Sequence, residues 1–101
     1  MVPDRLARLD WIELAGCPRA YVAVSPWSRT IGLAWLSDLP EGCGLLIPWC
    51  SAVHTFGMRF ALDVDFLDGD GRVLRSAERV GARRMLRCRG AAAVLERRAR
   101  G

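Results

Sequence analysis

The sequence feature that most constrains the fold is a run in which apolar and acidic residues alternate before a glycine-rich turn. Residues 62–67 read Leu-Asp-Val-Asp-Phe-Leu, and this two-residue period is typical of a strand with one buried face. Residues 68–71 read Asp-Gly-Asp-Gly, a turn sequence, and residues 73–74 resume an apolar strand. The pattern therefore predicts an antiparallel hairpin in the second half of the chain.

The length and composition of the chain predict one globular domain over residues 1–101. Of the 101 residues, 51% are apolar and 26% are charged, which allows one modest core and excludes a disordered chain. No apolar run approaches the ~20 residues of a membrane span. The N-terminus also lacks the apolar segment of a signal peptide. We therefore expect a cytoplasmic protein without a membrane partner.

One amphipathic helix is predicted over residues 26–37. Ser25 followed by proline is typical of a helix N-terminus, where the missing N–H of proline costs nothing. Trp27, Ile31 and Trp35 recur every four residues, which places them on one face of a helix. We therefore expect the two tryptophans to lie in the core.

Several further strands are predicted from β-branched and aromatic runs that end at glycine or proline. Residues 6–14 fit either an edge strand or a short helix. Residues 78–84 look irregular. The expected strands cover residues 20–24, 45–47, 53–58, 85–89 and 91–96.

The cysteines and the single histidine have weak metal-ligand spacing. Cys43, Cys50 and His54 come closest to a zinc set, but a structural zinc site has four ligands at better-known spacings. Free cysteines of a cytoplasmic protein are usually reduced and often buried. The acidic turn at residues 68–71 lacks the rest of a calcium-binding loop. We therefore expect no metal and no cofactor.

The formal charge of +4 hides an uneven distribution of arginine. Residues 1–71 contain five arginines and nine acidic residues, whereas residues 72–101 contain ten arginines and two acidic residues. These arginines are scattered, and they lack the interleaved aromatic residues of a single-strand binder. The pattern favours a solvated basic face, and nucleic-acid binding is the third function that we consider.

Asp63 is the residue around which a functional site is predicted. It lies within an apolar strand, and burying an unpaired carboxylate is costly, so we expect Arg29 or Arg59 to neutralise it. Such a pair is either structural or part of a pocket. The pocket would also contain His54 and Met58, and it would bind a small polar or anionic ligand. This ligand-binding or accessory domain is the preferred hypothesis.

A small hydrolase-like enzyme is the alternative function. His54 is the one side chain that titrates near neutrality unaided, and Asp63 could orient it as a general base. Cys50 or Thr55 could then act as the nucleophile. The sequence contains no nucleophile elbow, P-loop or dinucleotide-binding glycine motif, so our interpretation leans away from catalysis.

Four segments resemble the motifs of one known family, in the order in which that family has them. They are the segments Ser28–Leu33, Gly42–Ile47, His54–Asp68 and Cys88–Glu96. Over residues 18–101 the chain is thereby similar to the family called domain of unknown function 192. The resemblance implies an α+β domain with a mostly antiparallel sheet curled toward a barrel and one main helix. It supplies no activity.

The sequence departs from the family pattern at several positions. Gly57 stands where many members have tryptophan, and Ala61 stands where a proline is common. Members usually continue to a further strand that this sequence lacks after residue 96. The resemblance therefore implies an exposed sheet edge or an incomplete barrel, through which the chain could form a homo-oligomer.

Overall fold

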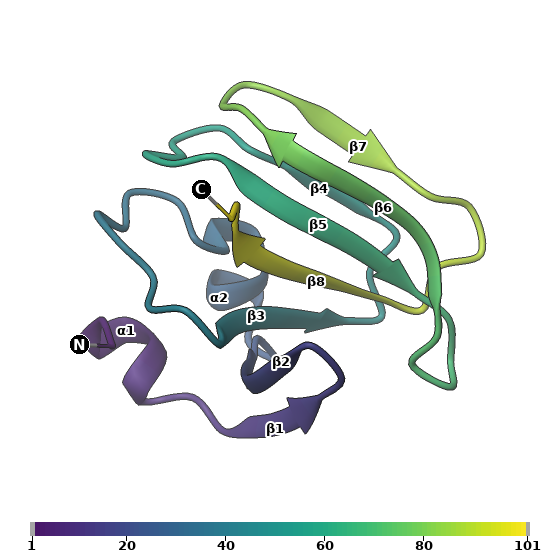
Figure 1. Ribbon diagram of the computed structural model, residues 1–101, viewed down its shortest axis with the longest axis horizontal. Coiled ribbons are helices and arrows are strands. Elements are labelled where there is room, and N and C mark those ends of the chain that lie inside the picture. The colour runs from purple at the N-terminus through teal and green to yellow at the C-terminus, as the bar shows by residue number, and fades with distance from the viewer. Residues whose placement is uncertain (1, 101) are drawn as a thin grey trace.

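The computed structural model describes residues 2–100, which form eight strands and two short helices (Figure 1). The fold is mostly β, because the longest helix has six residues. The elements in chain order are α1 (Asp4–Ala7), β1 (Trp11–Leu14), β2 (Cys17–Val22), α2 (Pro26–Ile31), β3 (Cys43–Pro48), β4 (Ala52–His54), β5 (Leu62–Leu67), β6 (Val73–Val80), β7 (Met85–Arg87) and β8 (Ala93–Arg98).

Six of the strands form one mixed sheet in the order β1-β2-β3-β8-β5-β6, and β4 pairs with β7 in a second, two-stranded sheet. Only β2 and β3 are parallel, and every other pair among the described strands is antiparallel. The predicted hairpin is confirmed as β5 and β6. The predicted barrel is wrong, because β1 and β6 remain at opposite edges of an open sheet and do not pair.

The last strand, β8, lies in the middle of the sheet, between β3 and β5 (Figure 1). Val94, Leu95 and Glu96 are consecutive and all buried, as expected for a strand covered on both faces. Val94 belongs to the main core, whereas Leu95 belongs to a smaller cluster on the opposite face. Since side chains alternate along a strand, Glu96 shares the main-core face with Val94.

The predicted helix begins where expected and ends earlier. The hydroxyl of Ser25 accepts a hydrogen bond from the backbone N–H of Ser28 at 3.0 Å, and Pro26 occupies the first turn. The helix ends at Gly32, whose φ of 56° and ψ of −128° leave the helical region. The expectation that the tryptophans are core residues is wrong, because Trp27 is 69% exposed and Trp35 is 60% exposed.

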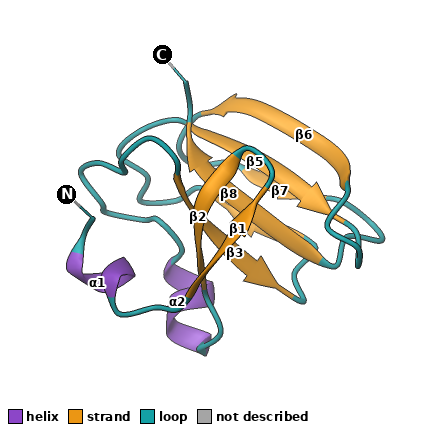
Figure 2. Ribbon diagram, turned by 60° about the horizontal axis from the view of Figure 1, so that its bottom comes forward, coloured by secondary structure: helices purple, strands orange, loops and turns teal. Residues whose placement is uncertain are grey.

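The two helices lie on the same side of the molecule, as Figure 2 shows. The guanidinium of Arg5 on α1 donates to the carbonyl oxygens of Gly32 and Ala34, at 2.9 and 2.8 Å. This contact fixes α1 to the chain that leaves α2. Neither helix in residues 2–100 is long and apolar enough to cross a bilayer.

The structure corrects several expected strand boundaries, and the strand expected over residues 53–58 is the shorter β4, which ends at His54. Residues 6–14, for which strand and helix were both open, divide into the end of α1 and the edge strand β1. The residues from 78 to 80, expected to be irregular, extend β6 along β5, where Val80 pairs with Leu62. The pairing with β5 supplies a backbone partner that the local sequence did not reveal.

Candidate functional site

A buried carboxyl group without a partner marks the candidate site. Glu96 is 1% exposed, and its Oε1 has no hydrogen-bond partner among the described residues. Its neighbours across the sheet are apolar, Leu45 on β3 and Val64 on β5. An unpaired polar atom in such surroundings costs free energy, so its presence requires an explanation.

The side chain of Glu96 lines a pocket of about 200 Å³ between α2 and the sheet. Arg29 and Thr30 contribute from α2, and His54 contributes from β4. We call this hollow the Glu96 pocket; it is lined by Arg29, Thr30, Ile31, Gly32, Ile47, Ala52, Val53, His54 and Glu96. The pocket therefore brings together two of the residues predicted from the sequence, Arg29 and His54.

Burial raises the pKa of Glu96 to about 8. No ion pair in residues 2–100 involves Glu96, so nothing offsets the loss of solvation. The carboxyl is therefore mostly protonated at pH 7, and it offers an O–H donor to whatever enters the pocket.

The hydrogen bonds of His54 fix its tautomer. Its Nδ1 accepts from the backbone N–H of Phe56 at 3.2 Å, so the proton lies on Nε2, which donates to the carbonyl oxygen of Thr30 at 3.1 Å. Both ring nitrogens are therefore engaged with the backbone. In this arrangement the imidazole positions α2 against β4 and has no free nitrogen to act as a general base.

Arg29 connects α2 to the end of β3. Its guanidinium donates to the carbonyl oxygens of Pro48 and Trp49, the latter at 3.0 Å. A guanidinium carries five N–H groups, so further donors remain in addition to these two. Arg29 thus places a positive charge in the wall of the Glu96 pocket.

The expected ion pair between Asp63 and Arg29 or Arg59 is not formed, and this prediction is wrong. The Oδ1 atom of Asp63 accepts from the backbone N–H of Arg79 at 3.0 Å. The ion pairs within residues 2–100 are Arg97 with Asp65, at 2.9 Å, and Arg98 with Asp38. Asp63 alternates with Leu62 and Val64 of the main core, so it points to the other face of the sheet from Glu96.

The remaining sequence candidates also lie outside the Glu96 pocket. Asp63 lines a separate hollow of about 40 Å³ with Arg97, Met58 is buried in the main core, and Arg59 is exposed. The buried hydroxyl of Thr55 donates to the carbonyl oxygen of Gly81 at 2.7 Å. Within residues 2–100, no group of three or more His, Cys, Asp or Glu residues could hold a metal ion.

An apolar surface adjoins the Glu96 pocket, and the two hollows share Thr30, Ile31 and His54. This surface encloses a shallow hollow of about 320 Å³, and we call it the aromatic shelf. It is lined by Trp27, Thr30, Ile31, Ala34, Trp35, His54, Phe56 and Gly57. Three of its aromatic side chains are half or more exposed, which is unusual for such large apolar groups when they cluster.

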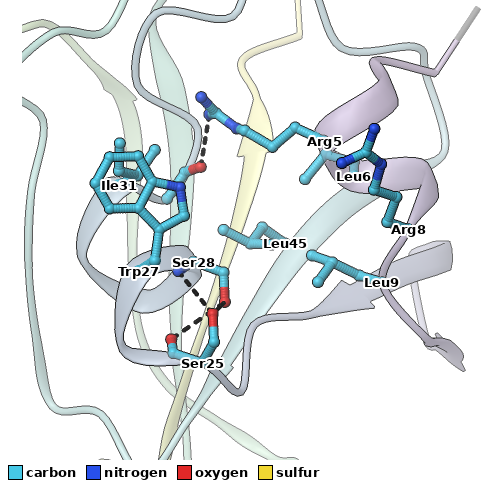
Figure 3. Close-up of a pocket in the computed structure, with 10 residues that line it drawn as sticks. Arg5, Leu6, Arg8, Leu9, Ser25, Trp27, Ser28, Ile31 and Leu45 are labelled. Atoms are coloured by element: carbon cyan, nitrogen blue, oxygen red, sulfur yellow. Dashed lines mark hydrogen bonds between the residues drawn. The ribbon is translucent and has the colours of Figure 1, made fainter.

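A third hollow, of about 350 Å³, lies between the two helices (Figure 3). Its floor is apolar, with Leu6, Leu9 and Leu45, and the ring of Trp27 covers one side. Arg5 reaches across it to the backbone of Gly32. The guanidinium of Arg5 already donates to two backbone carbonyl oxygens here. We therefore interpret this hollow as the place where α1 packs against α2.

Gly32 makes close packing between α2 and Glu96 possible. A methyl group at this position would lie 3.1 Å from Glu96 Oε1, and its φ of 56° strains any residue with a side chain. We expect Gly32→Ala to lower the free energy of unfolding by about 1–3 kcal/mol in urea titrations. The control is Gly69→Ala, whose added methyl would meet nothing within 4 Å. Equal stability of the two variants would contradict this account.

Sequence reasoning missed Glu96, although its position in an apolar strand was a usable signal. Two residues after Val94, it belongs on the same face as an apolar core residue. What the sequence could not show is that β8 lies in the middle of the sheet with this face packed against the main core.

Fold and site together define a small, mostly β domain in which one helix and an open mixed sheet enclose a polar pocket. The chain belongs to the DUF192 family, described as Uncharacterized ACR, whose model matches residues 13–100. The recognised resemblance is therefore confirmed.

Two solved structures share this fold. A protein of unknown function from Novosphingobium aromaticivorans superposes with a TM-score of 0.72 at 23% identity, covering 80% of this chain and 63% of the other. A candidate transcription regulator from Sinorhizobium meliloti gives a TM-score of 0.74 at 23% identity, covering 80% of this chain and 68% of the other. The chain thus spans less than two thirds of the first neighbour. No curated protein shows significant similarity to the sequence.

Proposed function

We propose that this protein is a small-ligand-binding domain and that the Glu96 pocket is its binding site. The observation that carries the proposal is the buried carboxyl of Glu96, which lacks a partner and faces a hollow lined by Arg29 and His54. A ligand that pairs with this carboxyl would relieve its unsatisfied state, which is a common reason for retaining such a group at a binding site.

The hydrolase alternative finds less support in the geometry. His54 and Asp63 lie in different hollows, and both imidazole nitrogens of His54 bond to the backbone. The proposal therefore concerns binding without catalysis. A cytoplasmic location and self-association through a sheet edge stay predictions from the sequence.

The proposal is tested by mapping three simple probes with backbone amide NMR: phenylacetate, benzyltrimethylammonium and benzamide, which are anionic, cationic and neutral. At least one is expected to shift the amide resonances of Thr30, Gly32, His54 and Glu96 in a saturable manner. If none of the three shifts these resonances, or if shifts gather only around Asp63, the Glu96 pocket is not the binding site.

Replacing Glu96 by methionine is expected to stabilise the free protein while removing probe binding. An apolar side chain of similar length ends the burial of an unsatisfied polar group, so the free energy of unfolding should rise by about 1–2 kcal/mol at pH 6. Urea titration measures the change. A purely structural glutamate would give the opposite sign, namely a less stable variant.

A further inference from the structure

The Glu96 pocket and the aromatic shelf are neighbouring hollows that differ in polarity. The pocket holds about 200 Å³, below the ~300 Å³ at which ligand pockets usually begin. The shelf adds a hollow of about 320 Å³ that shares Thr30, Ile31 and His54 with the pocket. A ligand larger than the Glu96 pocket therefore has room to extend onto the shelf.

The shelf is suited to a flat, apolar ring. Trp27 is 69% exposed, Trp35 60% and Phe56 50%, and aromatic rings pair with such side chains by offset or edge-to-face packing. The backbone holds Trp35 in place, because its N–H donates to the carbonyl oxygen of Gly57 at 2.8 Å. A methyl group at Gly57 would lie 3.1 Å from the indole ring of Trp35, so this ring can pack here only because residue 57 has no side chain.

The pocket end is suited to a hydrogen-bond acceptor that carries negative charge. Three side chains surround Glu96. Helix α2 presents the guanidinium of Arg29, β4 presents the imidazole of His54, and α1 presents Arg5, which donates to the backbone of Gly32. The neighbours on β3 and β5 are apolar. With Glu96 protonated, the pocket therefore has donors and positive charge and no ionised acid.

We propose that this combined site binds an aromatic carboxylate, with the ring on the aromatic shelf and the carboxylate accepting hydrogen bonds from the Glu96 carboxyl and from Arg29. This inference rests on the proposed function and specifies its ligand class. An ionised Glu96 would repel such a ligand, so binding requires the proton that the apolar surroundings keep on this group.

The test compares phenylacetate with benzyltrimethylammonium, whose charges do not change between pH 6 and pH 9. Isothermal titration is expected to detect phenylacetate binding that weakens about tenfold between pH 7 and pH 9, as the proton of Glu96 is lost. Glu96→Gln is expected to bind phenylacetate at pH 6 as well as the original protein does, and to lose the pH dependence, because the amide donates at every pH.

Matched tryptophan variants test the aromatic shelf. Trp27→Ala is expected to weaken phenylacetate binding about tenfold. Trp49→Ala is the control, because Trp49 is 81% exposed and lines neither the pocket nor the shelf. Both side chains are largely exposed, so both variants should fold. Equal binding by the two variants would overturn the placement of the ring.

Different probe results would contradict this inference and the proposed function. If benzyltrimethylammonium shifts the pocket resonances and binds more tightly as the pH rises, the site exists and takes cations, so the aromatic carboxylate is wrong. If neither charged probe binds and only benzamide shifts those resonances, the carboxylate is again wrong while the pocket stands. If no probe reaches the pocket, both proposals fall.

Discussion

Between pH 4.5 and pH 8, the free energy of unfolding is expected to fall as the pH rises, by up to about 1.4 kcal/mol per pH unit from one residue. The residue is Glu96, whose pKa rises from the ordinary 4.5 to about 8 in the folded chain. In this window the folded state keeps the proton that the unfolded state has released. The contribution of Glu96 to the free energy of unfolding is therefore greatest below pH 4.5, and it is lost as the pH rises through 8.

The slope is measured by urea unfolding at four pH values from 5.5 to 8.5. Glu96→Gln should remove it, since the amide does not titrate, while the exposed Glu78→Gln should leave it unchanged. Hydrogen bonds from backbone N–H groups lower the pKa of Asp68 below its usual 3.8, so that acid affects stability only at lower pH. An identical slope in the original protein and in Glu96→Gln would refute the assignment.

Truncating Phe66 to alanine is expected to cost about 3–5 kcal/mol of unfolding free energy, the largest loss that we predict for a single substitution. Phe66 is fully buried on β5, in the main core beneath the six-stranded sheet. Removing its ring leaves a cavity that neighbouring strands, held by their hydrogen bonds, cannot close. Urea titration again gives the magnitude.

The control for Phe66 is the same chemical change at an exposed position. Phe56→Ala removes a ring that is 50% exposed on the aromatic shelf, so it should cost no more than about 1 kcal/mol. Comparable losses in the two variants would mean that Phe66 does not anchor the core as the structure indicates.

Local patterns in the sequence predicted the parts of the fold that local interactions determine. The alternation over residues 62–67 gave β5 and its hairpin, and the Ser25 cap gave the start of α2. The end of α2 was misjudged because the spacing of Trp27 and Trp35 fits a helix, yet Gly32 leaves the helical region between them. The barrel implied by the family resemblance depended on edge pairing, which the sequence does not encode locally.

The same reasoning predicted only part of the candidate site. Arg29 and His54 were selected for their chemistry and do line one pocket. Asp63 was given the central role because it is an acid among apolar residues, but its neighbours alternate and its side chain belongs to the other face. Glu96 is also an acid among apolar residues, but its side chain points to the main-core face. This orientation distinguishes the two acids, because β5 and β8 each pair with two strands.

The central place of β8 has a consequence for the order in which this protein can form during synthesis. Within the sheet, β8 alone joins the strands on one side, β1 to β3, to those on the other, β5 and β6. Among the described strands β8 comes last in chain order, so the two parts of the sheet stay unjoined until residues 93–98 have been synthesised. Arg29 and Glu96 line the same pocket but are sixty-seven positions apart, so the Glu96 pocket is complete only after β8 has paired with β3 and β5.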